Sequence, residues 1–357
     1  MISPASKAIL LCLACLAAAP AVVGQNTRSM VKKEGPADPN AELKYRKKWA
    51  VVVGINYNPG DRKALNRGKI DRLDKAESDA REFYDLILKY YSYRKDEVVL
   101  LTGKEATKEA IEGYLQNGFL CDLNRVGPDD SVLFYFSGHG HLRREQSVGY
   151  LIPFDVRKTE GGEPDYATAI NTSVDLVKNL RANCPARHKL MILDCCHSGS
   201  VFRLDEGDGG GRSPDEKVGP DLFRAPAFQA MTASREWQVA SDGDALSNHS
   251  PFTKVLLHAL SSIPGKQIAL QPHFTVSELF HEMQMMLHGS PLPEDQSPQS
   301  WWLDGNRGEF FFFPNPNAEY PQDELKLTED ERKIFLAMVP TTFGNWWADE
   351  FPWFMPS

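Results

Sequence analysis

The sequence is poor in cysteine, with 6 in 357 residues, and two of these, Cys12 and Cys15, lie in the apolar N-terminal segment. The remaining cysteines are too few for a disulfide scaffold, so a hydrophobic core must stabilise the fold. A disulfide between Cys121 and Cys184 could form in an oxidising compartment, but we expect two buried thiols. The adjacent Cys195 and Cys196 are not expected to bridge each other, because such a bond is strained.

Basic clusters and long apolar runs are also missing beyond the N-terminus. The formal net charge is -8, and no run of lysine and arginine resembles a phosphate-binding stripe, so nucleic acid is not an expected partner. No transmembrane helix and no internal repeat is predicted after residue 24. Hydrophobic residues make up 42% of the chain and aromatic residues 10%, which is enough for a sizeable core.

Residues 1–24 have the form of a secretory signal peptide. Lys7 precedes an apolar run from Ala8 to Val23, and small residues at its end suit cleavage before Gln25. The alternative is an uncleaved anchor, but the alanine-rich run is short for a hydrocarbon core about 30 Å thick. The sequence therefore predicts an exported protein, either periplasmic or extracellular.

Shifts in composition predict the organisation of the remaining chain. Residues 25–46 are polar and are expected to form a flexible lead-in. One domain is expected over residues 47–314, with a glycine-rich mobile linker and candidate processing region at 201–226. Residues 315–357 are expected to contain a helix, which begins at a capping-box signature, and an aromatic-rich tail that packs on the domain or binds a partner.

Strand-like and helix-like segments alternate along the domain. Strands are expected at residues 50–55, 97–101, 131–137, 190–194, 228–232 and 309–313, and helices near 83–90, 107–120, 173–182, 251–260 and 276–287. Several of the strand-like runs are continuously apolar, as in strands that are buried on both faces. The pattern predicts an α/β fold with a mostly parallel six-stranded sheet and helices on both faces.

Two of the predicted strands end in residues that can carry chemistry. Ser137-Gly138-His139-Gly140 follows one strand, and Cys195-Cys196-His197-Ser198-Gly199 follows Asp194 at the end of another. The carboxyl ends of parallel strands meet at one edge of a sheet, and an imidazole can convert a nearby thiol into a nucleophilic thiolate. The pattern predicts a cysteine hydrolase with His139 as the base. Alternation puts Cys195 and Cys196 on opposite sides of the strand and does not choose between them.

A zinc cluster is the alternative use of these residues. His139, His141, Cys195, Cys196 and His197 could supply ligands, but neither the Cys-x2-Cys nor the His-Glu-x2-His spacing is present. We therefore predict no metal ligands and expect His141 and His197 either to be structural or to support the site residues from outside.

The motif Asp194-Cys195-Cys196-His197-Ser198-Gly199 resembles the nucleophile motif of the metacaspases, in the caspase-like clan of cysteine peptidases, and Ser137-Gly138-His139-Gly140 is similar to their histidine motif. Further similar stretches are Ala50–Tyr57, Gly149–Asp155, Thr232–Arg235 and Ser250–Thr253, so the resemblance covers about residues 48–313. It implies a caspase-like three-layer sandwich and a bacterial, orthocaspase-type member of peptidase family C14.

The resemblance also implies roles for individual residues. Cys196, directly before His-Ser-Gly, is the implied nucleophile and His139 the acid and base, with the backbone N–H groups of Gly140 and Cys196 as the oxyanion hole. Asp194 and Asp79 match an acidic pocket that selects arginine or lysine. The chain reads Lys-Ala-Glu-Ser-Asp where the family usually has Gly-Cys-x-Asn-Asp, so the match at Asp79 is the weaker of the two.

The function implied by the resemblance is a cysteine endopeptidase that cleaves proteins or peptides after arginine or lysine. Its substrates could include the chain itself, because Arg203, Arg212, Lys217 and Arg224 lie in or beside the predicted linker. No cofactor is required. Some metacaspases bind calcium; Glu160, Glu163 and Asp165 do not reproduce their acidic cluster, so calcium dependence stays open. The alternative function is a catalytically silent caspase-like binding or scaffold protein.

Overall fold

The computed structural model describes residues 43–64, 70–204, 220–234, 248–267, 272–286, 298–305 and 308–321. The predicted signal peptide, most of the predicted lead-in, residues 205–219 of the predicted linker and the chain beyond residue 321 lie outside these described residues. In the described part of the chain, no helix is long and apolar enough to cross a membrane.

A six-stranded sheet forms the centre of the fold, with strand order β10-β8-β7-β3-β1-β2. Its strands are β1 (Lys48–Gly54), β2 (Val98–Thr102), β3 (Ser131–Ser137), β7 (His188–Asp194), β8 (Ala227–Thr232) and β10 (Gln299–Trp302). All neighbouring pairs are parallel except β8 with β10. The predicted α/β class and mostly parallel six-stranded sheet are therefore confirmed.

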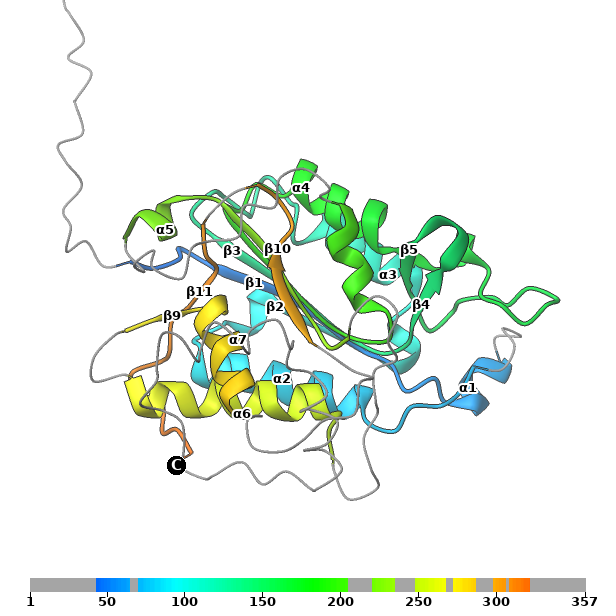
Figure 1. Ribbon diagram of the computed structural model, residues 1–357, viewed down its shortest axis with the longest axis horizontal. Coiled ribbons are helices and arrows are strands. Elements are labelled where there is room, and N and C mark those ends of the chain that lie inside the picture. The colour runs from blue at the N-terminus through cyan, green and yellow to red at the C-terminus, as the bar shows by residue number, and fades with distance from the viewer. Residues whose placement is uncertain are drawn as a thin grey trace, which may run out of the picture. The chain divides into compact units, whose positions relative to one another are not determined.

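Helices cover both faces of this sheet (Figure 1). One face carries α2 (Ala76–Tyr90), α6 (Pro251–Gln267) and α7 (Val276–Met285); the other carries α3 (Lys108–Gly113) with the π-helical turn Tyr114–Gly118, and α4 (Asn179–Asn183) with the π-helical turn Thr172–Lys178. Side chains of β1 alternate between the two cores. Val51 packs with the α3 and α4 side, and Val52 packs with the α2, α6 and α7 side. This arrangement confirms the predicted three layers.

Smaller elements surround the main sheet. A three-stranded antiparallel sheet contains β4 (Gly140–Arg143), β5 (Val148–Leu151) and β6 (Ile170–Asn171), and a two-stranded sheet pairs β9 (Phe274–Thr275) with β11 (Phe311–Phe312). The short helices are α1 (Pro59–Ala64) and α5 (Pro220–Arg224), with 3-10 turns at Lys95–Glu97, Gly103–Glu105, Arg144–Gln146, Tyr166–Thr168 and Ser198–Leu204.

The sixth strand of the sheet is not the one that we predicted. The run at 309–313 contributes only β11, which pairs with β9 outside the main sheet, whereas β10 takes the antiparallel edge position. Phe311 and Phe312 are buried against other parts of the chain, so their apolar run is that of a core segment. Strand β10 lies at the edge of the sheet with Trp301 42% exposed, and it lacks the continuous apolar pattern of a central strand.

Three segments beside the predicted domain boundaries have defined contacts or secondary structure among the described residues. The end of the predicted lead-in is anchored, because the Tyr45 hydroxyl lies 2.7 Å from His188 Nδ1 and Arg46 forms an ion pair with Asp130 at 2.6 Å. The predicted mobile linker begins with the 3-10 turn Ser198–Leu204 and ends with α5. The start of the predicted tail packs on α2, where the Tyr320 hydroxyl donates to the Tyr90 carbonyl at 2.9 Å.

Candidate active site

Three central strands end at the same level, which brings the predicted site residues to one edge of the sheet. Gly54 of β1 is in register with Ser137 of β3, and Ser137 is in register with Asp194 of β7. The N–H of Gly138 then donates to the Asp194 carbonyl at 3.2 Å. The strand order changes direction between β1 and β3, and the carboxyl ends of strands at such a point commonly form functional sites.

Gly54 lets helix α2 approach this edge closely. A β-carbon at this position would lie 2.3 Å from the Ala76 carbonyl oxygen and 2.5 Å from the Ala80 β-carbon, closer than real atoms come. Only glycine fits between β1 and α2 here. The first turns of α2, which carry Asp79, are therefore held beside the ends of β3 and β7.

Contacts with Asp71 and Tyr57 help to orient the His139 side chain. Its Nε2 lies 2.8 Å from the Asp71 carbonyl oxygen, which can only accept, so Nε2 carries the proton and Nδ1 is the basic nitrogen of the neutral ring. The ring also packs against Tyr57, with centroids 4.7 Å apart. The Tyr57 hydroxyl accepts from the His139 N–H at 2.9 Å and donates to the Ile152 carbonyl.

The Cys196 backbone lies directly against the histidine loop. A β-carbon at Gly140 would be 2.0 Å from the Cys196 carbonyl oxygen and 3.1 Å from the Cys195 sulfur. His197 adopts a left-handed conformation with φ of 57°, which turns the chain sharply after Cys196. Ser234, which follows β8, holds this turn, because its Oγ donates to the Cys195 carbonyl at 3.1 Å and its carbonyl accepts from the Gly199 N–H at 2.9 Å.

The two adjacent thiols have different surroundings. Cys195 is 1% exposed in the core, and burial, with smaller contributions from Cys196 and Asp194, raises the pKa of its thiol well above the ordinary value. Cys196 is partly exposed at the turn. Only Cys196 is therefore placed to meet a molecule from solvent, a distinction that sequence alternation alone could not make.

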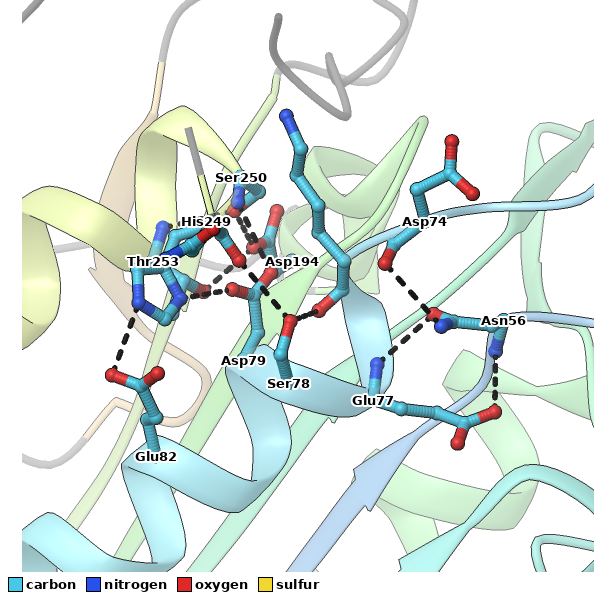
Figure 2. Close-up of polar contacts among 12 residues, drawn as sticks. Asn56, Asp74, Glu77, Ser78, Asp79, Glu82, Asp194, His249, Ser250 and Thr253 are labelled. Carbon is cyan, nitrogen blue, oxygen red and sulfur yellow. Dashed lines mark hydrogen bonds and ion pairs between the residues drawn. The ribbon is translucent and has the colours of Figure 1, made fainter. Parts of the chain in front are cut away.

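The two carboxylates that we predicted for a specificity pocket come together at the N-terminus of α6 (Figure 2). Asp79 Oδ2 accepts from the Ser250 N–H at 3.2 Å, and Asp194 Oδ2 accepts from the Ser250 hydroxyl and from the Thr253 hydroxyl, the latter at 2.7 Å. Both carboxylates are buried. Negative charge at a helix N-terminus is favourable, so α6 and the two aspartates stabilise one another.

His249 adds a further contact to this cluster. Its Nδ1 lies 2.7 Å from Asp79 Oδ1, and its Nε2 lies 3.0 Å from Glu82 Oε2. Burial of the ring opposes its protonation, but the hydrogen bond and charge of Asp79, together with Glu82, raise the pKa of His249 above its ordinary value.

Sequence reasoning missed several of these groups. The Asp71 carbonyl and the contacts of Tyr57 leave no signal in side-chain patterns. Ser250 and Thr253 lie in a stretch that we noted for its resemblance, but we assigned them no role. His249 precedes that stretch, and nothing local distinguished it from any other polar loop residue.

Other predicted side chains have contacts outside this cluster. His141 Nδ1 lies 3.1 Å from the Tyr166 hydroxyl and its Nε2 lies 3.1 Å from Glu163 Oε2, while Asp165 pairs with Arg157 at 3.4 Å. Among the described residues, no three histidine, cysteine or acidic side chains are arranged to hold a metal ion. Cys121 and Cys184 are both buried as free thiols.

One open surface hollow, about 600 Å³ in volume, lies beside α3. Lys108, Glu109, Glu112, Gly113, Gln116, Asp155, Arg157, Ala167 and Thr168 line it. It contains none of the predicted site residues, so we do not associate it with the candidate active site.

Comparison with known proteins gives the family of this fold and site. The caspase-domain model of peptidase family C14 matches residues 47–308. Metacaspase-1 of Meyerozyma guilliermondii is 26% identical over 230 residues, covering 60% of this chain and 50% of the relative. Metacaspase-1B of Aspergillus niger is 25% identical over 227 residues, covering 57% and 48%. Metacaspase-1 of Pyricularia oryzae is 25% identical over 167 residues, covering 44% and 38%.

These alignments span half or less of each curated relative, so the similarity is limited to a shared part of each relative. The relatives are fungal, and a bacterial origin for this chain stays a prediction. The family model covers well over half of the chain and includes the histidine and cysteine motifs. The chain therefore belongs to the caspase-domain family of peptidases, as its resemblance to metacaspases led us to expect.

Proposed function

We propose that this protein is a cysteine endopeptidase in which Cys196 is the nucleophile and His139 the acid and base. One observation carries the proposal. The histidine loop packs on the Cys196 backbone so closely that only glycine fits at position 140, and Cys196 is partly exposed, whereas its neighbour Cys195 is buried. Family membership supports the same reaction class.

The proposed reaction follows from the tautomer of His139. Nδ1 removes the proton from Cys196 Sγ, and the thiolate attacks the substrate carbonyl carbon while the N–H groups of Gly140 and Cys196 hold the oxyanion. The imidazolium gives its proton to the leaving amine, and the tetrahedral intermediate collapses. The amine departs, and the substrate acyl group stays on Cys196 as a thioester. Water, deprotonated by His139, then attacks the thioester and releases the carboxylate product and the Cys196 thiol.

We further propose that the substrate carries arginine or lysine before the scissile bond. Support comes from the meeting of Asp79 and Asp194 beside the nucleophile, since Asp194 lies two residues before Cys196 and both aspartates bond to Ser250. Two buried carboxylates favour a guanidinium or ammonium group and repel an acidic side chain.

The test compares three fluorogenic peptides that differ only in arginine, lysine or aspartate before the cleaved bond. We expect turnover of the basic peptides by the wild type and none by Cys196→Ala. Turnover of only the aspartate peptide would contradict the pocket assignment. Equal turnover by Cys196→Ala would contradict the assignment of the nucleophile.

Self-processing and export belong to the same proposal. Arg203 and Arg224 lie in helical turns, so cleavage after either requires local unwinding; Arg212 and Lys217 lie outside the described residues. We propose that processing takes place in this region of a protein exported to the periplasm or the extracellular space. Mapping new N-termini in the wild type and in Cys196→Ala, with and without calcium, tests processing and calcium dependence together.

A further inference from the structure

A histidine lies against one carboxylate of the proposed specificity pocket. His249 lies between Asp79 and Glu82, with one ring nitrogen within 3.0 Å of each carboxylate. A carboxylate accepts hydrogen bonds and an imidazole donates from both nitrogens only when protonated, so this geometry corresponds to an imidazolium with two N–H donors. The His249 side chain is 14% exposed, which limits screening of the contact by solvent.

The two aspartates of the pocket therefore have different partners. Asp79 Oδ1 accepts a hydrogen bond from the His249 imidazolium, and Asp79 Oδ2 accepts one from the Ser250 N–H. The hydrogen bonds that Asp194 accepts from Ser250 and Thr253 come from neutral hydroxyl groups. Figure 2 shows both aspartates beside the N-terminus of α6, with His249 on the side of Asp79 and Glu82.

We propose that His249 sets the charge that the pocket offers to a basic substrate side chain, because its imidazolium neutralises Asp79. This inference rests on the proposed preference for arginine or lysine. With His249 protonated, the His249–Asp79 pair is neutral overall, so Asp79 contributes little to the attraction of a substrate cation. When His249 loses its proton, Asp79 adds its negative charge and discrimination in favour of a cation increases.

The groups that surround His249 fix the direction of this effect. Asp79 and Glu82 on α2 face the ring, and Asp194 of β7 lies across Ser250. Burial and, to a lesser extent, the charges of Asp79 and Asp194 raise the pKa of the Tyr135 hydroxyl of β3, which lies 2.6 Å from Thr253 Oγ1. Burial of the ring opposes its protonation, and the two α2 carboxylates outweigh that opposition. Glu82 is 56% exposed and acts on the ring from the solvent side, so it can be changed without altering the buried aspartates.

The experiment measures kcat/KM from pH 5 to 9 for peptides with arginine or its neutral isostere citrulline before the scissile bond. Catalytic steps common to the two peptides cancel in the arginine-to-citrulline ratio, which therefore reports the charge of the pocket. In the wild type, we expect this ratio to rise with pH as His249 loses its proton. In Glu82→Gln, the midpoint of the rise should move to lower pH, because one of the two carboxylates that stabilise the imidazolium is gone.

His249→Gln should remove most of the pH dependence and raise the ratio at pH 6 by roughly three- to tenfold, the size expected for loss of one unit charge near a partly desolvated site. His258→Gln makes the same substitution within α6, which begins two residues after His249, and should leave the ratio as in the wild type. If His249→Gln does not fold, the pH midpoint of the arginine-to-citrulline ratio in Glu82→Gln still tests the role of His249.

The outcomes separate this inference from the function on which it rests. If the wild type cleaves the arginine peptide and its arginine-to-citrulline ratio depends on pH in the same way as the ratios of Glu82→Gln and His249→Gln, the role of His249 is overturned. The proposed peptidase function is then unaffected. A uniform loss of activity on both peptides in His249→Gln, with the Glu82→Gln midpoint unmoved, would overturn the role of His249 too, because His249 would then only support the fold. No turnover of any basic peptide by the wild type would overturn the proposed function itself.

Discussion

Gly140 and Cys196 are so close that a single added methyl group could not fit between their backbones: a β-carbon at Gly140 would lie 2.0 Å from the Cys196 carbonyl oxygen. The atom it would meet belongs to the main chain, which cannot rotate away as a flexible side chain can. The close approach holds the loop of the proposed base against the loop of the proposed nucleophile. The absence of a side chain at Gly140 is thus a requirement of the site geometry.

Gly140→Ala is expected to separate the two loops and to lower kcat/KM by roughly a hundredfold, since displacements of about 1 Å have effects of that size on catalysis. Gly113→Ala on α3 is the matched control, because nothing lies within 4 Å of the β-carbon it would add. Activity on an arginine peptide and the denaturation midpoint are measured for both variants. Wild-type activity in a folded Gly140→Ala protein would contradict the importance of this contact.

The two adjacent cysteines provide a second test in which the same substitution is made at neighbouring positions. Burial raises the pKa of the Cys195 thiol and excludes reagents from it, whereas Cys196 is partly exposed. We expect iodoacetamide at about pH 7.5 to label Cys196 in the wild type and in Cys195→Ala, and to leave Cys195 unlabelled in folded Cys196→Ala. Tandem mass spectrometry of the shared peptide assigns the label, and labelling at Cys195 would reverse the assignment.

The fold could be predicted from the sequence because its central strands are buried on both faces. The run Ser131–Ser137 is apolar almost throughout, and the predicted strand matches the observed one residue for residue. Continuous apolar runs of this kind depend on burial alone and need no knowledge of partners. The edge strand β10 has one neighbour and an exposed Trp301, so its sequence carries little of that signal.

From the sequence pattern alone, we could predict only those residues of the candidate site whose side chains lie at or just after the ends of apolar strands. His139, Cys196 and Asp194 follow apolar runs, and parallel register brings such positions together. The contact between His139 and the Asp71 carbonyl depends on backbone placement, which no residue pattern encodes. His249 and Asp79 are 170 positions apart, and nothing in either segment indicates the other.

Thr253 links the proposed specificity pocket to the stability of the fold. Its buried hydroxyl donates to Asp194 at 2.7 Å and lies 2.6 Å from the Tyr135 hydroxyl. Thr253→Val keeps the shape but leaves these buried groups one partner short, which should cost about 2 kcal/mol of unfolding free energy and raise KM for an arginine peptide. Thr253→Ser retains the hydroxyl and should lose less than half as much. Equal stability of the Thr253→Val and Thr253→Ser proteins in denaturant titrations would contradict this account.

Stability at acidic pH should depend on His188, at the opposite end of β7 from the site. Nε2 lies 2.9 Å from the Ala225 carbonyl and Nδ1 lies 2.7 Å from the Tyr45 hydroxyl, an arrangement that suits the neutral ring. Burial, aided by nearby Arg187 and Lys189, lowers the pKa of His188 to about 4 despite its bond to Ala225.

The unfolded chain binds a proton at this histidine near pH 6.5, whereas the folded chain resists it down to about pH 4. Between these values the unfolded state holds more protons, so acid favours unfolding, and the His188 contribution is complete above pH 6.5 and lost towards pH 4. The loss should amount to about 3 kcal/mol of unfolding free energy.

Denaturant titrations at pH 7, 6, 5 and 4 measure this loss in the wild type, in His188→Gln and in His281→Gln. Glutamine does not titrate, so His188→Gln should be less stable than the wild type at pH 7 but should lose about 3 kcal/mol less on acidification. His281→Gln on α7 controls for the substitution and should follow the wild type. A parallel decline in all three proteins would mean that other groups cause the acid sensitivity and that the His188 ring becomes protonated in the folded state without cost.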